Sequence, residues 1–275
     1  MTPQKVTQVT PQLKSLKSPS PPPPPPQLVN PLKVPTLKLL SNPSDNPKVK
    51  KNLGIGVLTS PLHLAPYNLS GYQVCPKASQ GCAAACLHTA GNPAFMEAKN
   101  KGRIRKTKMF FEDRLNFMST LIGDIEKLQT YATLMGYPLG IRLNATSDFP
   151  YENLKVTHKG VSYANLFEIF PSVQFYDYGA VVKRMLKPLP KNYHLTFSRK
   201  EDNHADCLKA LEAGVNVAVV FRKKLPDTYL GSPVINGDLH DYRPLDGKHK
   251  RGVIVGLKAK GLGRSDTSGF VVDIV

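Results

Sequence analysis

Short apolar segments alternate with helical segments through the second half of the chain. The apolar segments contain many β-branched and aromatic residues, as strands buried on both faces do; they are 139–144, 173–176, 193–198, 215–221 and 252–257. The segments between them have helical patterns at 165–170, 181–186 and 205–213. This alternation predicts an α/β fold with a parallel sheet covered on both faces.

Further strands are predicted at 52–59, 233–236 and 270–275. Seven or eight such strands suit a (β/α) barrel of the TIM type, complete or partial. The alternative is a doubly wound open sheet, but no G-x-G-x-x-G follows the first strand. Two helices are predicted before the second strand, at 94–109 and at about 112–135, and the latter has an apolar stripe typical of core packing.

The N-terminal segment 1–50 differs in composition from the rest. It contains an unbroken proline run from Pro21 to Pro26 and no aromatic residue. Such a segment cannot bury a core, and its prolines favour an extended polyproline helix. We expect a disordered, basic tail that serves as a tether or as a docking segment, followed by a single domain at 51–275.

The net charge of +17 favours a polyanionic partner, most simply a nucleic acid or a nucleotide. The alternative is that the lysines only increase solubility. The chain has no apolar run long enough to span a membrane and no secretory signal, which predicts a cytoplasmic protein without membrane contact. In a reducing compartment its four cysteines are expected to bind metal or to react, and not to form disulfides.

Three of the four cysteines lie in the loop 72–91, directly after the first predicted strand. Cys75, Cys82 and Cys86 have the spacing C-x6-C-x3-C, and His88 follows. Three thiolates can hold a [4Fe–4S] cluster with one open iron, or Zn²⁺ with His88 as fourth ligand. The alternative is three thiols without a metal. The fourth cysteine, Cys207, lies on a predicted helix and is expected in the core.

Polar residues follow the carboxyl ends of the predicted strands, where barrel enzymes carry their active sites. Asp148, Asp177 and Asp238 are therefore candidate catalytic acids or bases. The alternatives are capping or turn residues, and for Asp238 an ion pair. Candidate substrate-binding residues at the same edge are Arg142, Asn144, Ser147, Tyr176, Tyr178, Ser198, Asp241, Lys258 and Lys260.

The predicted helix 94–109 is strongly basic. Arg103, Arg105 and Lys106 are candidate contacts to nucleic-acid phosphates, because lysine and arginine supply most of that binding energy. The alternative is a solvated helix face.

A cysteine triplet after the first strand of a β/α barrel resembles the layout of radical SAM enzymes. That superfamily has C-x3-C-x2-C and a GGE-like stretch, whereas this chain has C-x6-C-x3-C and NATSD. These departures argue against SAM as a cofactor.

A closer resemblance is to a group of bacteriophage proteins labelled after a mycobacteriophage gene product. The residues that carry it are NLGIGVLT, the cysteine loop, RLN-x-TSD ending at Asp148, FYDY ending at Tyr178, and GD-x-x-D ending at Asp241. The resemblance covers about 52–275 and implies a phage or prophage origin.

Together these features predict a phage-type metalloenzyme that acts on a nucleotide or a nucleic-acid base. The alternative is a non-catalytic nucleic-acid-binding protein with a structural Cys3His zinc site.

Overall fold

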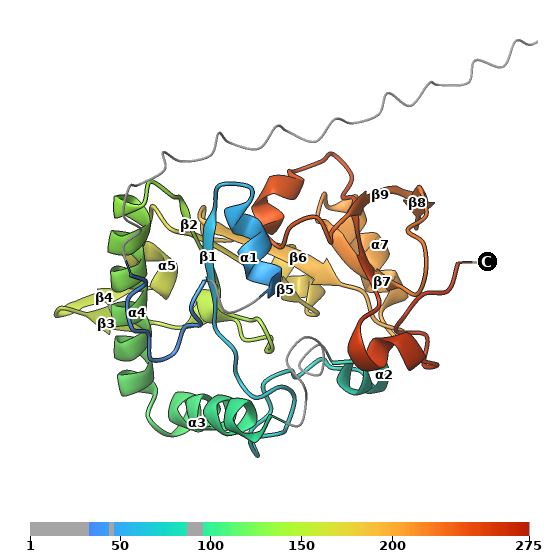
Figure 1. Cartoon of the computed structure of the whole chain (residues 1–275). Helices are drawn as coiled ribbons and strands as arrows, with labels where there is room; N and C mark the ends of the chain where they lie inside the picture. The colour runs from blue at the N-terminus through green and yellow to red at the C-terminus, as the bar shows by residue number, and fades with distance from the viewer. Residues whose placement is uncertain (1–32, 44–46, 87–95, 275) are drawn as a thin grey trace, which may run out of the picture.

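The computed structural model describes residues 33–43, 47–86 and 96–274 (Figure 1). The proline run of the predicted tail and His88 lie outside these residues. The described part contains an eight-stranded sheet with helices on both faces and a separate two-stranded sheet. None of its helices has the length and apolar character needed to cross a membrane.

The large sheet is almost entirely parallel. Its strands in spatial order are β1 (Leu58–Pro61), β2 (Leu139–Arg142), β5 (Gln174–Gly179), β6 (Tyr193–Ser198), β7 (Val217–Phe221), β10 (Ile254–Lys258), β9 (Ser232–Asn236) and β8 (Thr228–Tyr229). Every neighbouring pair is parallel except β8 with β9. The small sheet is an antiparallel hairpin, β3 (Val156–His158) with β4 (Val161–Tyr163).

The predicted α/β class with a parallel sheet is confirmed, but the predicted barrel is not. Six strands, from β1 to β10, lie side by side in the order of the chain, as they would in a barrel. The sheet is open in the described part of the chain, with β1 at one end and the antiparallel β8 at the other. A barrel would require hydrogen bonds between its first and last strands.

Helices cover the two faces of the sheet unequally. They are α1 (Pro47–Leu53), α2 (Gln80–Ala84), α3 (Glu97–Glu112), α4 (Arg114–Leu134), α5 (Leu166–Ile169), α6 (Val182–Met185) and α7 (His204–Glu212), with 3₁₀ turns η2 (Tyr151–Asn153), η3 (Arg243–Asp246) and η4 (Gly261–Ser265). The elements predicted between 139 and 258 are found within about three residues of their expected ends. Cys207 is buried, as predicted.

The main core lies between one face of the sheet and α4 to α7. Helix α4 buries Phe117, Leu121, Ile125 and Leu128, whose spacing of three or four residues places them on one side of a helix. The apolar stripe predicted for 112–135 is therefore core packing. Asp113 accepts a hydrogen bond from Asn116 N at 3.2 Å and caps the start of α4.

The opposite face of the sheet is more polar. Along β5, Phe175 points into the main core, whereas Tyr176 packs with Val57 and Tyr242 beneath α1 and η3. Side chains of a strand alternate between the two faces, so consecutive residues of β5 have different environments.

The strand predicted at 52–59 is displaced. Residues up to Leu53 belong to α1, and β1 starts at Leu58. Asn52 is completely buried and donates from Nδ2 to Thr59 Oγ1 at 3.0 Å. The turn between them has Gly56 at φ 75°, a conformation that favours glycine. The last predicted strand, 270–275, is reduced to a single bridge between Val272 and Phe221 in its described part.

The folded body begins N-terminal to the boundary predicted between residues 50 and 51. Leu39 and Leu40 are buried in the main core. Asp124 of α4 accepts hydrogen bonds from the backbone N–H groups of both, at 2.7 and 3.0 Å. A buried carboxylate supplies the partner that these extended backbone groups require.

Candidate functional site

The cysteine loop lies at the carboxyl-end edge of the sheet. Its short helix α2 is held by Glu201, which follows β6. Glu201 accepts hydrogen bonds from Ser79 Oγ at 2.8 Å and from Gly81 N at 2.7 Å. Ser79 in turn accepts from Cys82 N at 3.2 Å, so that the cap of α2 fixes the backbone at Cys82.

The loop also contacts the segment that follows β2. Asp148 N donates to Val74 O at 2.9 Å, and Cys75 Sγ lies 3.8 Å from Thr146 O. The cysteine loop and Asp148 therefore lie side by side at this edge.

The three thiols are close enough to influence one another. Burial, with a smaller contribution from the negative charge of Cys86, raises the pKa of Cys75 to about 11. Burial, with smaller contributions from the charges of Cys86 and Cys75, raises the pKa of Cys82 to about 12. Three thiolates here would repel one another, and a bound cation would relieve that repulsion.

No group of three or more His, Cys, Asp or Glu side chains within residues 33–43, 47–86 and 96–274 is arranged to hold a metal ion. The donor set itself fits a soft metal, since thiolates prefer zinc and iron–sulfur clusters. The predicted fourth ligand, His88, lies outside the described residues.

Basic side chains approach the cysteines from two elements. Arg103 of α3 faces Cys86, whose charge raises the pKa of the guanidinium against the larger effect of burial, which lowers it. Arg103 Nη1 is buried and has no hydrogen-bond partner among the residues that the structure describes. Lys200, after β6, lowers the pKa of Cys82, although burial dominates that pKa. These cations act against the effect of burial but do not outweigh it, so the pKa values of Cys75 and Cys82 stay raised.

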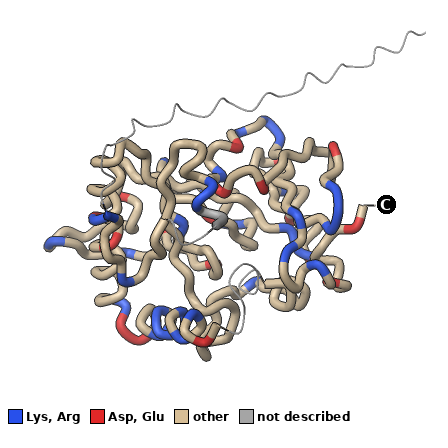
Figure 2. Tube along the Cα trace, viewed as in Figure 1, with Lys and Arg blue, Asp and Glu red and all other residues tan. Residues whose placement is uncertain are grey.

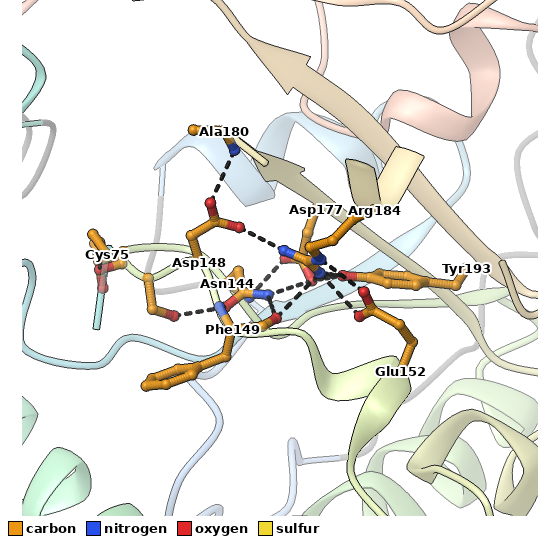
Figure 3. A network of polar contacts seen from close by, with 11 residues as sticks. Cys75, Asn144, Asp148, Phe149, Glu152, Asp177, Ala180, Arg184 and Tyr193 are labelled. Atoms are coloured by element: carbon orange, nitrogen blue, oxygen red, sulfur yellow. Dashed lines mark hydrogen bonds and ion pairs between the residues drawn. The ribbon is translucent and has the colours of Figure 1, made fainter. Parts of the chain in front are cut away.

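Asp148 belongs to a buried ion-pair network (Figure 3). Its Oδ1 accepts from Arg184 Nη1 at 2.6 Å, and its Oδ2 accepts from Ala180 N at 2.9 Å. Arg184 Nε also donates to Glu152 at 2.7 Å. Burial raises the pKa of Asp148, and the charge of Arg184 acts against this rise. In the same view Asp148 lies between Cys75 and Arg184.

Asp177 lies deeper in the same network. It is completely buried and accepts hydrogen bonds from Asn144 N at 2.6 Å and from Tyr193 Oη at 3.1 Å. Burial raises the pKa of Asp177 to about 7. Asn144 Oδ1 accepts from Ser147 Oγ at 2.8 Å, which shapes the loop that carries Asp148. The structure thus brings together Asp148, Asp177, Asn144 and Ser147.

Four other candidates lie on the polar face of the sheet. Arg142 Nη1 and Asp241 Oδ2 form a buried ion pair at 3.1 Å. Tyr176 Oη donates to the same carboxylate at 3.4 Å, and the Arg142 guanidinium lies 4.7 Å from the centre of the Tyr178 ring. These contacts connect β2 and β5 to the segment before η3, and they are separate from the network of Asp148.

The remaining candidates are dispersed. Asp238 accepts from Lys260 Nζ at 2.6 Å and from the backbone N of Lys258 at 2.9 Å, so it is grouped with basic residues and not with Asp148. Ser198, at the end of β6, accepts through its carbonyl from Asn203 Nδ2 at 3.0 Å.

The three basic candidates of α3 have different environments. Arg105 is exposed, Lys106 donates to the carbonyl of Leu39, and Arg103 faces the cysteines. The exposed basic side chains of α3 are Lys101, Arg105 and Lys108, which line a surface depression of about 490 Å³ with Ile104, Met109 and Glu112. Figure 2 shows this basic helix.

Arg184, Glu152 and Glu201 were not among the residues predicted for the site. Arg184 is separated from Glu152 by 32 residues and from Asp148 by 36. Nothing in the sequence near Arg184 indicates these partners. Glu201 does follow a predicted strand, which is a signal that could have included it.

Comparison with known proteins found one family. The model of the family described as Gene product 88 matches residues 37–274. The match starts close to the point where the chain enters the main core, at Leu39, and it confirms the resemblance to phage gene-product proteins. Neither the curated proteins nor the solved structures gave a match.

Proposed function

This chain belongs to the Gene product 88 family, and we propose that it is a metalloenzyme of the phage type that modifies a nucleotide or a nucleic-acid base. In this proposal Cys75, Cys82 and Cys86 bind a [4Fe–4S] cluster or Zn²⁺ at the carboxyl-end edge of the sheet. The observation that carries it is the position of the cysteine loop, which contacts the segment of Asp148 through Asp148 N to Val74 O at 2.9 Å and Cys75 Sγ to Thr146 O at 3.8 Å.

The surroundings of the cysteines support a reactive site more than a remote structural one. Parallel α/β proteins bind their ligands at the carboxyl ends of the strands. Arg103 and Lys200 would stabilise the negative charge of a thiolate-bound centre or of a substrate. A [4Fe–4S] cluster would supply redox chemistry, and zinc would supply a Lewis acid. SAM is not part of the proposal, because the cysteine spacing departs from that of radical SAM enzymes.

Within the network of Figure 3, Asp148 is the proposed acid–base group. Burial raises the pKa of its carboxyl above the ordinary value, and a raised pKa suits a carboxyl group that is to donate or accept a proton in the reaction. Asp177 is completely buried, so in the proposed site it orients Asn144 and Tyr193 and does not meet the substrate.

Metal content tests this proposal directly. Protein purified without oxygen should contain one metal centre per chain. A brown colour with absorbance near ~400 nm, which arises from thiolate-bound iron, identifies a cluster, and colourless protein with one zinc identifies the alternative metal. Serine variants of Cys75, Cys82 and Cys86 should each lose the metal.

Cys207→Ser is the matched control, because Cys207 is a buried residue of α7, outside the cysteine loop, and donates to Asn203 Oδ1 at 3.5 Å. It should retain the metal. Folded wild-type protein that contains neither iron nor zinc would refute the proposal, and so would a Cys75, Cys82 and Cys86 triple variant that keeps its metal.

A second candidate function is supported by the basic row on α3. A non-catalytic protein could bind nucleic-acid phosphates through Lys101, Arg105 and Lys108, while zinc on the cysteines serves only to stabilise the fold. Here His88 would be the fourth ligand.

The salt dependence of DNA binding tests the α3 surface. Changing Lys101, Arg105 and Lys108 to alanine should flatten the plot of log affinity against log salt by about 2 for single-stranded DNA, since each lost phosphate contact changes the slope by about 0.7. Alanine variants of Lys155, Lys183 and Lys187, which are exposed and outside α3, remove the same charge. Equal slopes for the two triple variants would exclude α3 as the binding surface.

A further inference from the structure

Besides the depression on α3, the protein has a cavity at the carboxyl-end edge of the sheet, and basic side chains make up most of its lining. Its volume is about 580 Å³, and its polar lining consists of Lys51, Arg222, Asp238, Lys258, Lys260 and Arg264. Arg222 follows β7, Asp238 follows β9, and Lys258 ends β10. Helix α1 contributes Lys51, Lys260 follows β10, and turn η4 contributes Arg264. Four elements therefore bring cations to one cavity, and the segment after β9 brings Asp238.

Some of these cations have partners inside the protein. Lys260 Nζ forms an ion pair with Asp238 Oδ1 at 2.6 Å, and Lys51 Nζ donates to the carbonyl of Asp238 at 2.7 Å. Arg222 Nε forms an ion pair with Asp273 at 2.6 Å, and its Nη1 donates to the carbonyl of Arg264 at 2.6 Å. These contacts hold the cavity wall in place.

Two cations remain available to a ligand. The ammonium of Lys258 and the guanidinium of Arg264 are exposed, and neither makes a hydrogen bond or an ion pair with any residue that the structure describes. Asp238 is the one carboxylate among the lining residues, against five cations. A cleft lined by one sign of charge concentrates ions of the opposite sign. The excess of positive charge indicates an anionic ligand with more than one charge.

The size of the cavity restricts the ligand further. Small-molecule sites commonly have volumes of roughly 300–1,000 Å³, and this cavity falls in that range. Lysine and arginine side chains around one cavity suit phosphate, because their hydrogen bonds to phosphate oxygens are charge-assisted. The lining contains no aromatic ring on which a base could stack. The residues therefore suit a phosphate chain better than a nucleobase.

The cavity and the cysteine loop are connected through η4. Gly263 of η4 lies beside the loop, because a Cβ atom placed on it would be in ordinary van der Waals contact with Ala85 Cβ, at 3.9 Å. In Figure 1 the dark red turn near the C-terminus lies beside α2, and Figure 2 shows Lys and Arg positions gathered on that side of the molecule. A molecule with its phosphates in the cavity would thus lie at the same edge as the cysteines.

We propose that this cavity binds the polyphosphate chain of a nucleoside di- or triphosphate. That the nucleotide is the substrate rests on the function proposed above, whereas the binding of the phosphate chain stands on the cavity alone. In this proposal Asp238 belongs to the wall of the phosphate site, whereas Asp148 and Asp177 belong to the network beside the cysteine loop.

Calorimetric titration of the full chain with inorganic tripolyphosphate tests the site. One equivalent should bind. Changing both Lys258 and Arg264 to alanine should weaken binding by about 100-fold, because each charge-assisted hydrogen bond to phosphate contributes roughly a factor of ten. Both side chains are exposed, and the thermal melt of the variant should match that of the wild type.

Lys183→Ala combined with Lys187→Ala is the matched control, since it removes two exposed charges that belong neither to the cavity nor to α3. It should leave tripolyphosphate binding within about twofold, because these residues are outside the cavity. If tripolyphosphate does not bind, or if both double variants weaken it equally, the proposal is wrong.

Three further ligands identify the source of the phosphate chain. ATP should bind with an affinity similar to that of tripolyphosphate and compete with it, and adenosine should not bind. An oligonucleotide that displaces tripolyphosphate at concentrations far below those needed for ATP would overturn the assignment to a free nucleotide. Cys75→Ser should bind tripolyphosphate normally. If that variant loses no metal while phosphate binding is intact, the metal proposal fails and the phosphate site stands.

Discussion

Replacing Arg184 with alanine is expected to lower the free energy of unfolding by roughly 3–5 kcal/mol. The variant would leave the carboxylates of Asp148 and Glu152 buried without their shared cation, which lies 2.6 and 2.7 Å from them. The side chains of all three residues are exposed by only 8–10 %. Uncompensated buried charge is among the most destabilising changes that a single substitution can cause.

Urea unfolding measures this loss. Arg105→Ala, which truncates an exposed arginine of α3, should change the unfolding free energy by no more than about 0.5 kcal/mol. A triple variant that replaces Arg184 with Met, Asp148 with Asn and Glu152 with Gln should recover much of the stability, because it removes the charge from both sides. A loss below about 1 kcal/mol in Arg184→Ala would mean that water screens the network.

Asp177→Asn is expected to change how stability depends on pH. Burial raises the folded-state pKa of Asp177 to about 7 from an ordinary value of 3.8. A raised carboxyl pKa means that the folded state holds the proton more tightly than the unfolded state. The stability contributed by this proton is fully present below about pH 4 and is lost as pH rises through about 7, at roughly 1.4 kcal/mol per pH unit.

The asparagine variant has no such proton to lose. The free energy of unfolding of the wild type minus that of Asp177→Asn should therefore fall between about pH 4 and pH 7 and level off above pH 7, as measured by urea unfolding at each pH. Asp273→Asn is the control. The hydrogen bond from Arg222 lowers the pKa of Asp273, so its titration is complete below this range and its difference from wild type should stay flat. Parallel curves for wild type and Asp177→Asn would show that Asp177 does not hold a proton near neutral pH.

Sequence patterns predicted the strands of the parallel sheet well where those strands are apolar and buried. The segment 193–198 coincides with β6, and 215–221 contains β7. Such strands lie between two layers, so hydrophobicity is required along their whole length and is visible in the sequence. The hairpin of β3 and β4 was not predicted, because it is half exposed and its strands have only three residues each.

The same patterns were misleading near the ends of the chain. Residues 52–53 belong to α1, although the residues that follow them resemble a strand. The buried side-chain amide of Asn52 donates to Thr59 and accepts from the backbone N of Asp241, which holds this end of α1 against the sheet. That contact spans 189 residues. Likewise, Leu39 and Leu40 follow a proline-rich segment, and only their contact with Asp124 shows them as part of the core.

The candidate site was predicted in part. The link between the cysteine loop and Asp148 followed from strand order, because consecutive parallel strands end at the same edge. The order of the strands along the chain did not predict that Asp238 lies apart from Asp148. Both residues come after strands, but β2 and β9 are far apart in the sheet, with β5, β6, β7 and β10 between them.

The sequence alone therefore determined the class of fold, the edge at which polar residues gather and the cysteine cluster, because these depend on local hydrophobicity and spacing. The tertiary structure decided that the sheet is open in the described part of the chain, that Arg184 joins Asp148 to Glu152, and that five cations and Asp238 line one cavity. Each of these features depends on residues tens to hundreds of positions apart. Local patterns carry no information about such pairings, because the energy of a buried charge depends on which groups the folded chain places beside it.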